Sequence, residues 1–269
     1  MQPTQFTHDS SGPLAGFRSP WAGARPLEGQ VALVTGAGRG IGRGIAQELS
    51  ASGAHVIAAD IQLPAAQETV GLLPHSGSAA RVDTSDPDSV SEMFDGALAE
   101  TTIDVVVNVA GVLSISPVTE LAADEWDRIM GVNARGPFLV ARAALPQMIE
   151  RRRGSIINIS STSGKEGEPT LAHYCASKFA VIGFTQALAR EVAEFDIRVN
   201  AICPGVVNTP MIGQVAAAWG SSADDLSADL QLLKRPQHPR EIGAAAVFLA
   251  TMPSITGQAI NVDGGTVFH

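Results

Sequence analysis

The stretch Thr35-Gly36-Ala37-Gly38-Arg39-Gly40-Ile41-Gly42 decides the fold of this 269-residue chain. It joins an apolar run at residues 31–34 to a segment with helical periodicity that begins near Ile41. Glycine accepts positive φ and leaves the backbone open to a ligand, and amides at a helix N-terminus favour an anion. The stretch therefore predicts a phosphate-binding strand–turn–helix unit, although an ordinary tight turn is the simpler interpretation of glycines alone.

The residues after the turn favour a dinucleotide. Three glycines give the turn the spacing GxxxGxG rather than GxGxxG: Gly36, Gly40 and Gly42. A second apolar run ends in Asp60, close to the spacing of roughly 20 residues expected for an acid that binds an adenosine ribose. Such a carboxylate accepts hydrogen bonds from the ribose hydroxyls and repels a 2′-phosphate, so we expect NAD rather than NADP. Arg39 opposes this expectation, because a basic side chain in the turn can bind a 2′-phosphate.

Composition and charge limit the other possibilities. The chain is 45% hydrophobic, which is enough for a sizeable core, and its net charge of −9 argues against a nucleic-acid partner. Cys175 and Cys203 stand in apolar segments without metal-ligand spacing, so neither a disulfide nor a metal site is expected. No leader and no apolar run of about 18 residues is seen, and we expect a cytoplasmic protein without a membrane anchor.

The order of the segments predicts the architecture. Residues 1–28 are rich in Pro, Gly, Ser and Thr and are expected to form a loosely ordered arm, whose aromatic residues Phe6, Phe17 and Trp21 could dock on this chain or a neighbour. Beyond it, short apolar runs alternate with helical segments: 31–35, 55–60, 103–110, 155–160, 197–202 and 259–262. This alternation predicts that residues 29–269 form a single α/β domain, with a doubly wound Rossmann-type parallel sheet flanked by helices on both faces.

A tyrosine and a lysine carry the strongest chemical signal. Tyr174 and Lys178 stand four residues apart in a segment predicted to be helical to about residue 194, so their side chains share one face. A nearby ammonium lowers the pKa of a phenol, and a phenol poised near the working pH is a good general base for an alcohol. A core aromatic beside a solvated lysine remains the alternative for the pair alone.

At this point the sequence resembles the short-chain dehydrogenase/reductase family, in its single-domain branch, from about residue 29 to the end. The motifs that carry the resemblance stand in family order: TGAGRGIG at 35–42, Asp60, Asp83, NVAG at 108–111, Asn133, Ser161, YCASK at 174–178, PGVVNTPM at 204–211 and ITGQAINVDGG at 255–265. Their joint occurrence makes the resemblance specific.

The resemblance implies four catalytic residues. Tyr174 would exchange the proton of the substrate hydroxyl, while Lys178 would bind the nicotinamide ribose and lower the pKa of the tyrosine. Ser161 would hold the substrate oxygen, with the neighbouring Ser160 and Ser163 as alternatives. Asn133 would hold, through a local helix distortion, a water that links Lys178 to solvent.

The resemblance also implies a set of residues around NAD. Asp83 would contact the adenine, residues 108–111 the adenosine ribose, and residues 204–209 the carboxamide. The full set is Gly36, Arg39, Gly40, Ile41, Gly42, Asp60, Asp83, Asn108, Ala110, Gly111, Tyr174, Lys178, Pro204, Gly205, Val207 and Thr209. Thr209 is also suited to cap the following helix. Val109 departs from the family's usual asparagine, which predicts a locally different hydrogen-bond network, and His173 is expected to be structural.

Residues 204–239 resemble the family's substrate-covering segment. Its apolar residues are expected to close over a ligand: Met211, Ile212, Val215, Trp219, Leu226 and Leu230. The segment lacks a basic cluster, so a small secondary alcohol, polyol or sugar is preferred over a thioester of a carrier. Glu166 and Glu168 could bind hydroxyls at the mouth of the pocket, although a solvated loop is the simpler interpretation.

Two alternative functions remain open. One is a 3-oxoacyl-thioester reductase of the same family, normally linked to NADPH, which Asp60 disfavours. The other is a non-catalytic dinucleotide-binding sensor or scaffold, which the complete catalytic set disfavours. By resemblance we also expect a homotetramer, assembled through the helices that carry Asn133 and Tyr174 and through the C-terminal strand; the sequence does not decide whether residues 267–269 reach a neighbour.

Overall fold

A computed structural model describes residues 19–269, so Phe6 and Phe17 lie outside the described residues. These residues form one seven-stranded sheet, in which all paired neighbours are parallel and the strand order is β3-β2-β1-β4-β5-β6-β7. The strands are β1 Val31–Thr35, β2 His55–Asp60, β3 Gly77–Arg81, β4 Val105–Asn108, β5 Gly154–Ile159, β6 Ile197–Pro204 and β7 Ala259–Val262.

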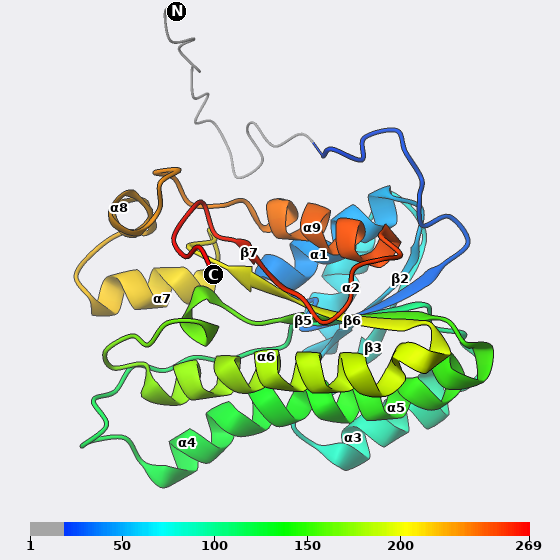
Figure 1. The fold of residues 1–269 in the computed structure, drawn as a ribbon, viewed down its shortest axis with the longest axis horizontal. Coiled ribbons are helices and arrows are strands. Elements are labelled where there is room, and N and C mark those ends of the chain that lie inside the picture. The colour runs from blue at the N-terminus through cyan, green and yellow to red at the C-terminus, as the bar shows by residue number, and fades with distance from the viewer. Residues whose placement is uncertain (1–18) are drawn as a thin grey trace, which may run out of the picture.

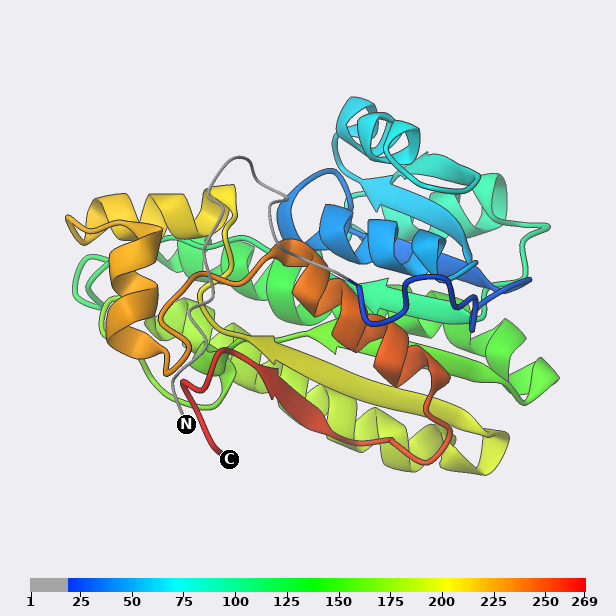
Figure 2. The ribbon, with the colours of Figure 1, turned by 90° about the horizontal axis from the view of Figure 1, so that it is seen from above.

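Helices cover both faces of this sheet, as Figures 1 and 2 show. The α-helices are α1 Gly40–Ala51, α2 Leu63–Gly71, α3 Pro87–Glu92, α4 Ala123–Met130, α5 Gly136–Arg151, α6 Ala172–Val192, α7 Pro210–Ala218, α8 Ala223–Leu230 and α9 Pro239–Thr251. In Figure 1, α1 and α9 lie on one face and α4, α5 and α6 on the other, while α7 and α8 stand beyond one end of the strands. The predicted doubly wound α/β fold is confirmed.

The apolar periodicity of the first helix explains how that face is packed. Ile45 and Leu49 of α1 are fully buried in a cluster with Val34 of β1 and Val247 of α9. Burial of one such side chain is worth about 1.5–3 kcal/mol, so the cluster fixes α1 and α9 on the sheet. Because α1 follows directly from β1, this packing also fixes the glycine turn between them.

Strand β3 was not expected from the sequence. Its residues, Gly77-Ser78-Ala79-Ala80-Arg81, are small or polar, and only Ala80 is buried. The strand lies at the edge of the sheet and forms through backbone pairing with β2, which needs no apolar side chains. Three other strands differ in their bounds: β4 is shorter than the predicted 103–110, β5 is shifted by one residue from 155–160, and β6 extends to Pro204.

The described part of the N-terminal arm packs on the domain. The indole N–H of Trp21 donates to the carbonyl of Ala244 in α9 at 3.1 Å, and Leu27 is fully buried. Of the alternatives for Trp21, docking on its own chain is the one observed. The boundary expected at residue 28 therefore lies inside a packed stretch.

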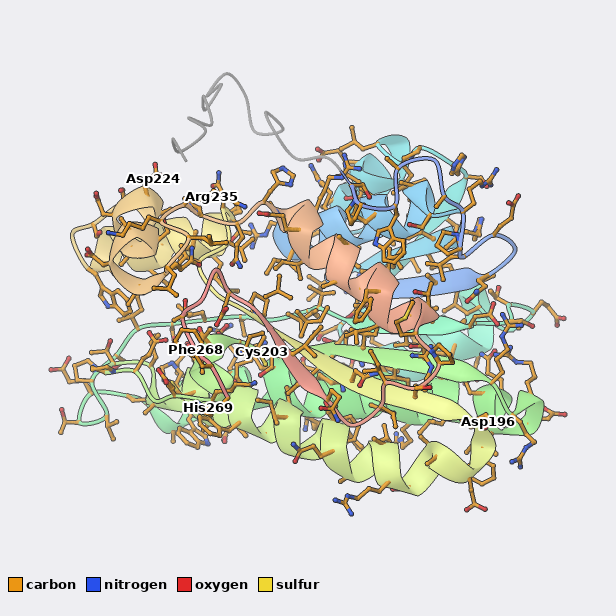
Figure 3. The ribbon with its side chains drawn as sticks, turned by 45° about the horizontal axis from the view of Figure 1, so that its top comes forward. Asp196, Cys203, Asp224, Arg235, Phe268 and His269 are labelled. Carbon is orange, nitrogen blue, oxygen red and sulfur yellow. The ribbon has the colours of Figure 1, made fainter. Side chains whose placement is uncertain are left out.

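The sheet order places a crevice at the carboxyl ends of the central strands. Strand β1 lies between β2 and β4, so the chain winds in opposite directions on its two sides. Ligands of open α/β sheets bind where the winding reverses. In Figure 3, Asp224 and Arg235 of the substrate-covering segment lie on the same side as Phe268 and His269, while Asp196, which precedes β6, marks the opposite side.

Candidate active site

A cavity of about 740 Å³ opens at this crevice. Most residues predicted for the site line it: Gly36, Arg39, Gly40, Ile41, Gly42, Asp60, Asp83, Ala110, Gly111, Ser161, Tyr174, Lys178, Pro204, Gly205, Val207 and Thr209. Asn108 and Asn133 do not. The fold thus brings together groups that are more than 170 residues apart in the sequence.

The glycine turn forms one wall through its backbone. Gly36 and Gly40 have φ values of 63° and 53°, in the left-handed region that glycine tolerates. A Cβ at Gly36 would stand 2.7 Å from the backbone of Ala110, and one at Gly42 would stand 2.1 Å from the carbonyl oxygen of Gly36. The turn therefore requires glycine at these positions and holds the loop after β4 against it.

The first turn of α1 fits an anion. Its N-cap, Arg39, makes no side-chain capping hydrogen bond, and no acidic residue stands in the first turn. The leading amides consequently keep their capacity to donate, and the helix dipole favours negative charge in front of them. A dinucleotide pyrophosphate is negatively charged and carries hydrogen-bond acceptors, so it suits these free amide donors.

Asp60 ends β2 beside the turn. Its Oδ2 accepts from the amide of Gly38 at 2.9 Å, and its Oδ1 accepts from the amide of Gln62 at 3.0 Å. Each carboxylate oxygen has a further lone pair, so the group can also accept from the two hydroxyls of a ribose. Asp83 is held in a similar way, because its Oδ1 accepts from the hydroxyl of Ser85 at 2.7 Å.

Asn108 lies behind the cavity wall rather than on it. Its side-chain amide donates to Asn158 Oδ1 at 2.8 Å, and the amide of Asn158 donates to Thr185 at 2.9 Å. This buried chain links β4, β5 and α6 under the cavity. The predicted direct contact of Asn108 with the cofactor is therefore corrected to a supporting position.

Asn133 also supports the site from behind. It is buried in a π-helical turn, Gly131–Arg135, between α4 and α5, so the predicted helix distortion is present. Its Oδ1 accepts from the amide of Val112 at 2.8 Å, and its amide donates to Ser177 Oγ at 3.0 Å. Asn133 thereby ties the loop after β4 to the helix that carries Tyr174. The water relay expected from the resemblance stays a prediction.

Tyr174 and Lys178 share one face of α6, as their spacing predicts. Both are buried, and Lys178 Nζ stands 5.6 Å from the centroid of the tyrosine ring. The ammonium donates to the carbonyl of Ile159 at the end of β5, at 2.9 Å. The lysine is thus anchored between the sheet and the cavity.

The pKa of Tyr174 corrects one expectation. Burial raises the pKa of its phenol to about 12, and a hydrogen bond with Ser161 opposes this rise only in part. The sequence predicts the reverse, a pKa lowered by Lys178. Burial also penalises the ammonium and lowers the pKa of Lys178 to about 8. A phenol so far from water needs a further positive charge nearby before it can act as a base at neutral pH.

Hydrogen bonds distinguish Ser161 from its two neighbours. The hydroxyl of Ser160 donates to the carbonyl of Lys178 at 2.9 Å, and that of Ser163 donates to Glu168 Oε1 at 2.8 Å. The hydroxyl of Ser161 accepts from the amide of Ser163 at 3.1 Å and, unlike the other two, also pairs with the phenol of Tyr174. This arrangement supports Ser161 as the serine that holds the substrate oxygen.

Three further residues singled out in the sequence, Val109, His173 and Thr209, also have defined contacts near the site. Val109 packs against the sheet core, and its backbone amide donates to Thr35 Oγ1 at 3.2 Å. His173 is fully buried, with Nε2 2.8 Å from Ser114 Oγ, as a structural residue would be. Thr209 lines the cavity and also caps α7 through the amide of Ile212.

The substrate-covering segment forms the far wall of the cavity. All six apolar residues expected to close over a ligand line it: Met211, Ile212, Val215, Trp219, Leu226 and Leu230. The sequence analysis missed three further apolar residues on this wall, Leu113, Leu171 and Val206. Leu113 and Leu171 lie in loops, where no periodicity marks a position as inward-facing.

Comparison with known proteins identifies the family. The family described as short chain dehydrogenase matches residues 30–219. This chain is a short-chain dehydrogenase. A 3-oxoacyl-[acyl-carrier-protein] reductase of Thermotoga maritima is 36% identical over 247 residues, which cover 90% of this chain and 99% of the relative. Galactitol 2-dehydrogenase of Agrobacterium fabrum is 36% identical over 256 residues, covering 89% and 98%.

A solved structure shares the fold of this short-chain dehydrogenase. A chain titled ribose-5-phosphate isomerase, from Brucella melitensis 16M, is 37% identical with a TM-score of 0.84 and covers 90% of this chain and 94% of its own. Family and relatives together identify an oxidoreductase that acts on CH–OH groups with a nicotinamide cofactor. Within residues 19–269, no helix of this short-chain dehydrogenase is long and apolar enough to span a membrane, and no cluster of His, Cys, Asp and Glu could hold a metal.

Proposed function

We propose that this short-chain dehydrogenase transfers a hydride between NAD and a secondary alcohol or the matching ketone, with Tyr174 as general base and acid. One observation carries the proposal: Ser161, Tyr174 and Lys178 line the same cavity as the glycine turn and Asp60. A non-catalytic sensor would have no need for a proton-transfer group at the end of a dinucleotide site.

The preference for NAD rests on Asp60. Its carboxylate lines the cavity beside the turn and is held by two backbone amides, so it cannot swing away from a 2′-phosphate without breaking them. Arg39 is exposed at the same rim and would partly offset the repulsion. The fixed carboxylate outweighs a solvated guanidinium, because exposed charges are screened.

The residues of the chain account for the proton transfer. A bound nicotinamide would supply the carbon that accepts or gives the hydride. Ser161 donates to the substrate oxygen, and Tyr174 removes the proton as that oxygen gains alkoxide character. The ammonium of Lys178, anchored to Ile159, stands 5.6 Å from the centre of the tyrosine ring. Together with the positive charge of an oxidised nicotinamide, it would offset the burial of the phenol and favour its ionised form. In reduction, the same phenol returns the proton.

The substrate side supports two classes. A small secondary alcohol, polyol or sugar is our first proposal, and the relative named galactitol 2-dehydrogenase agrees with it. The second candidate is a 3-oxoacyl-thioester, favoured by the relative named 3-oxoacyl-[acyl-carrier-protein] reductase and by the apolar far wall. Asp60 separates them, because such thioester reductases of the family are normally NADPH-linked.

We also propose a homotetrameric, cytoplasmic enzyme. Exposed aromatic side chains support the assembly: Phe138 of α5 is 42% exposed and Phe179 of α6 is 47% exposed. Apolar groups left on the outer face of these helices are typical of an interface. Light scattering at micromolar concentration should give about four times the mass of one chain, and a monomer would refute the assembly.

A screen of carbonyl compounds and alcohols with NADH, NADPH and their oxidised forms tests the function. We expect turnover with NADH and secondary ketones, and none with any compound would favour the sensor. The two directions should also differ in pH dependence. Oxidation needs the ionised phenol, so its rate should rise about tenfold per pH unit below the phenol pKa, whereas reduction needs the protonated phenol and should fall above it. The same trend in both directions would contradict Tyr174 as the proton carrier.

A further inference from the structure

Glu168 is a carboxylate beside the reaction centre that the proton transfer does not use. It lies in the loop between β5 and α6 and lines the cavity together with Ser161 and Tyr174. It is partly buried, whereas Glu166 of the same loop is exposed. The carboxylate is near enough to raise the pKa of Tyr174. Both glutamates line the cavity, and Glu168 is the more buried of the two.

The position of Glu168 is fixed by several contacts. Its Oε1 accepts from Ser163 Oγ at 2.8 Å, and the amide of Ser163 donates to Ser161 Oγ. One residue thus links the carboxylate to the serine that holds the substrate oxygen. The backbone of Glu168 is also restrained, because its amide donates to Cys175 Sγ at 3.4 Å and Pro169 follows it.

Thr170, two residues after Glu168, shows that this loop is held in a strained backbone conformation. Thr170 has a φ of 64°, which a β-branched residue rarely adopts, and the carbonyl of Thr170 accepts from the amide of Ser116 at 2.9 Å. Backbone strain of this kind persists where the surroundings over-determine it, as in ligand sites. The loop therefore presents Glu168 in a preformed position.

One carboxylate oxygen of Glu168 has spare capacity. Among residues 19–269 no hydrogen bond reaches its Oε2, and Glu168 forms no ion pair. The surrounding wall is largely apolar, with Leu113, Leu171 and Trp219 on it. A carboxylate in such a wall gains most from a ligand group that donates a hydrogen bond to it.

We infer that Glu168 is a specificity-determining residue that binds a hydroxyl or ammonium group on the carbon next to the reacting carbinol carbon, so that the preferred substrates are vicinal diols, amino alcohols and the matching α-substituted ketones. The inference rests on the proposed function, because it assumes that Ser161 and Tyr174 hold the substrate oxygen. It names a substrate class narrower than secondary alcohols.

The experiment compares matched ketones that differ in one donor group. NADH-dependent kcat/KM is measured for 3-hydroxybutan-2-one against butan-2-one and for 2-hydroxyacetophenone against acetophenone, with 3-aminobutan-2-one as the ammonium arm. The wild-type protein should prefer the donor-bearing ketone of each pair. Electronic activation of the ketone is the same for every variant, so it cancels when the ratios of wild type and variant are compared.

In Glu168→Ala the ratio should fall about 10- to 100-fold, the loss expected when a hydrogen bond to a charged group is removed. Glu168→Gln keeps an acceptor without the charge and should lose less, with the amine arm affected more than the hydroxyl arm. Glu120→Gln is the control, since it removes one negative charge from an exposed residue that does not line the cavity and should leave the ratio unchanged.

The outcomes separate the inference from the proposed function. An unchanged ratio in Glu168→Ala, or a wild-type protein that prefers the plain ketones, overturns the inference, because a merely structural role would lower both rates together. Activity on other carbonyl compounds but on neither hydroxyketone overturns it too and leaves the proposed function standing. No reaction with any carbonyl compound, although NADH binds, refutes the proposed function itself.

Discussion

The two ends of the cavity differ in what lines them, since one is lined by backbone and the other by side chains. At the nucleotide end, the wall is backbone: the glycine turn and the loop at Ala110 approach so closely that no Cβ fits between them. At the substrate end, the wall consists of side chains, carried by α7, α8 and the loop that holds Glu168. Tyr174 and Ser161 stand between the two ends.

This difference indicates where the chain tolerates change. A backbone wall with clearances under 3.0 Å admits almost no substitution, so the nucleotide end is the same for any substrate. A wall of side chains on short helices changes its shape with each substitution, and such a substitution lowers the stability of the rest of the fold only slightly. Substitutions at the two ends and at the reaction centre between them should therefore differ in the size of their effects.

The largest effect is expected at the reaction centre. Tyr174→Phe removes the proton-transfer group but keeps the ring, and general acid–base catalysis contributes about 10²–10⁴-fold. We expect kcat to fall by at least about 10³-fold, while the dissociation constant of NADH changes less than about threefold. Steady-state rates and fluorescence titration of NADH measure the two quantities. Rates near the wild-type value with every active ketone would refute the assignment.

A smaller effect is expected at the nucleotide end. Asp60→Ala removes the repulsion of a 2′-phosphate and the acceptors for the ribose, so the ratio of kcat/KM for NADH over NADPH should fall about 100-fold. Adding Arg39→Ala to Asp60→Ala should lower kcat/KM for NADPH again, because the exposed guanidinium that could bind the 2′-phosphate is then absent. Thermal unfolding provides the control, since Asp60 also accepts from Gly38 and Gln62. An unchanged cofactor ratio in a folded variant would remove the argument for NAD.

The nucleotide end could be predicted from the sequence because its determinants are local. The turn, the apolar strand before it and Asp60 after the next strand are short-range patterns with a direct physical meaning. The same holds for Tyr174 and Lys178, whose helical spacing alone brings them together.

Properties that depend on packing between distant segments were not predictable. The pKa of Tyr174 depends on how completely the fold removes it from water, which spacing does not reveal. Asn108 was expected on the cavity wall, but a buried partner from β5 holds it behind the wall. Strand β3 carries no apolar pattern because it forms by pairing with an existing edge. For Glu168 the sequence left hydroxyl binding and a solvated loop open, and its contact with Ser163 follows from the fold of the loop, which no spacing indicates.

At the substrate end, Trp219→Ala should raise KM for the ketone about tenfold and leave the affinity for NADH within twofold. The indole lines the cavity from the end of α7, and loss of part of its apolar contact with a ligand is worth about 1–2 kcal/mol. Steady-state kinetics measure the change. Trp126→Ala is a matched control, because both tryptophans are 39% exposed and Trp126 does not line the cavity. Equal effects of the two substitutions would show that Trp219 contributes only to stability.

The smallest effect compares one glycine from each end. Gly213 is exposed in the interior of α7, and a methyl group added there would have no neighbouring atom within 4 Å, whereas a Cβ at Gly36 would meet the backbone of Ala110. Gly213→Ala should therefore stabilise α7 by about 0.5–1 kcal/mol, since alanine has the higher helix propensity. Hydrogen exchange of the α7 amides should slow about two- to fivefold, because local opening of this helix becomes rarer. Gly36→Ala should instead weaken NADH binding and lower the midpoint of thermal unfolding. If both substitutions were tolerated equally, the nucleotide wall would have more freedom than its clearances allow, and the contrast between a backbone wall and a side-chain wall would fail.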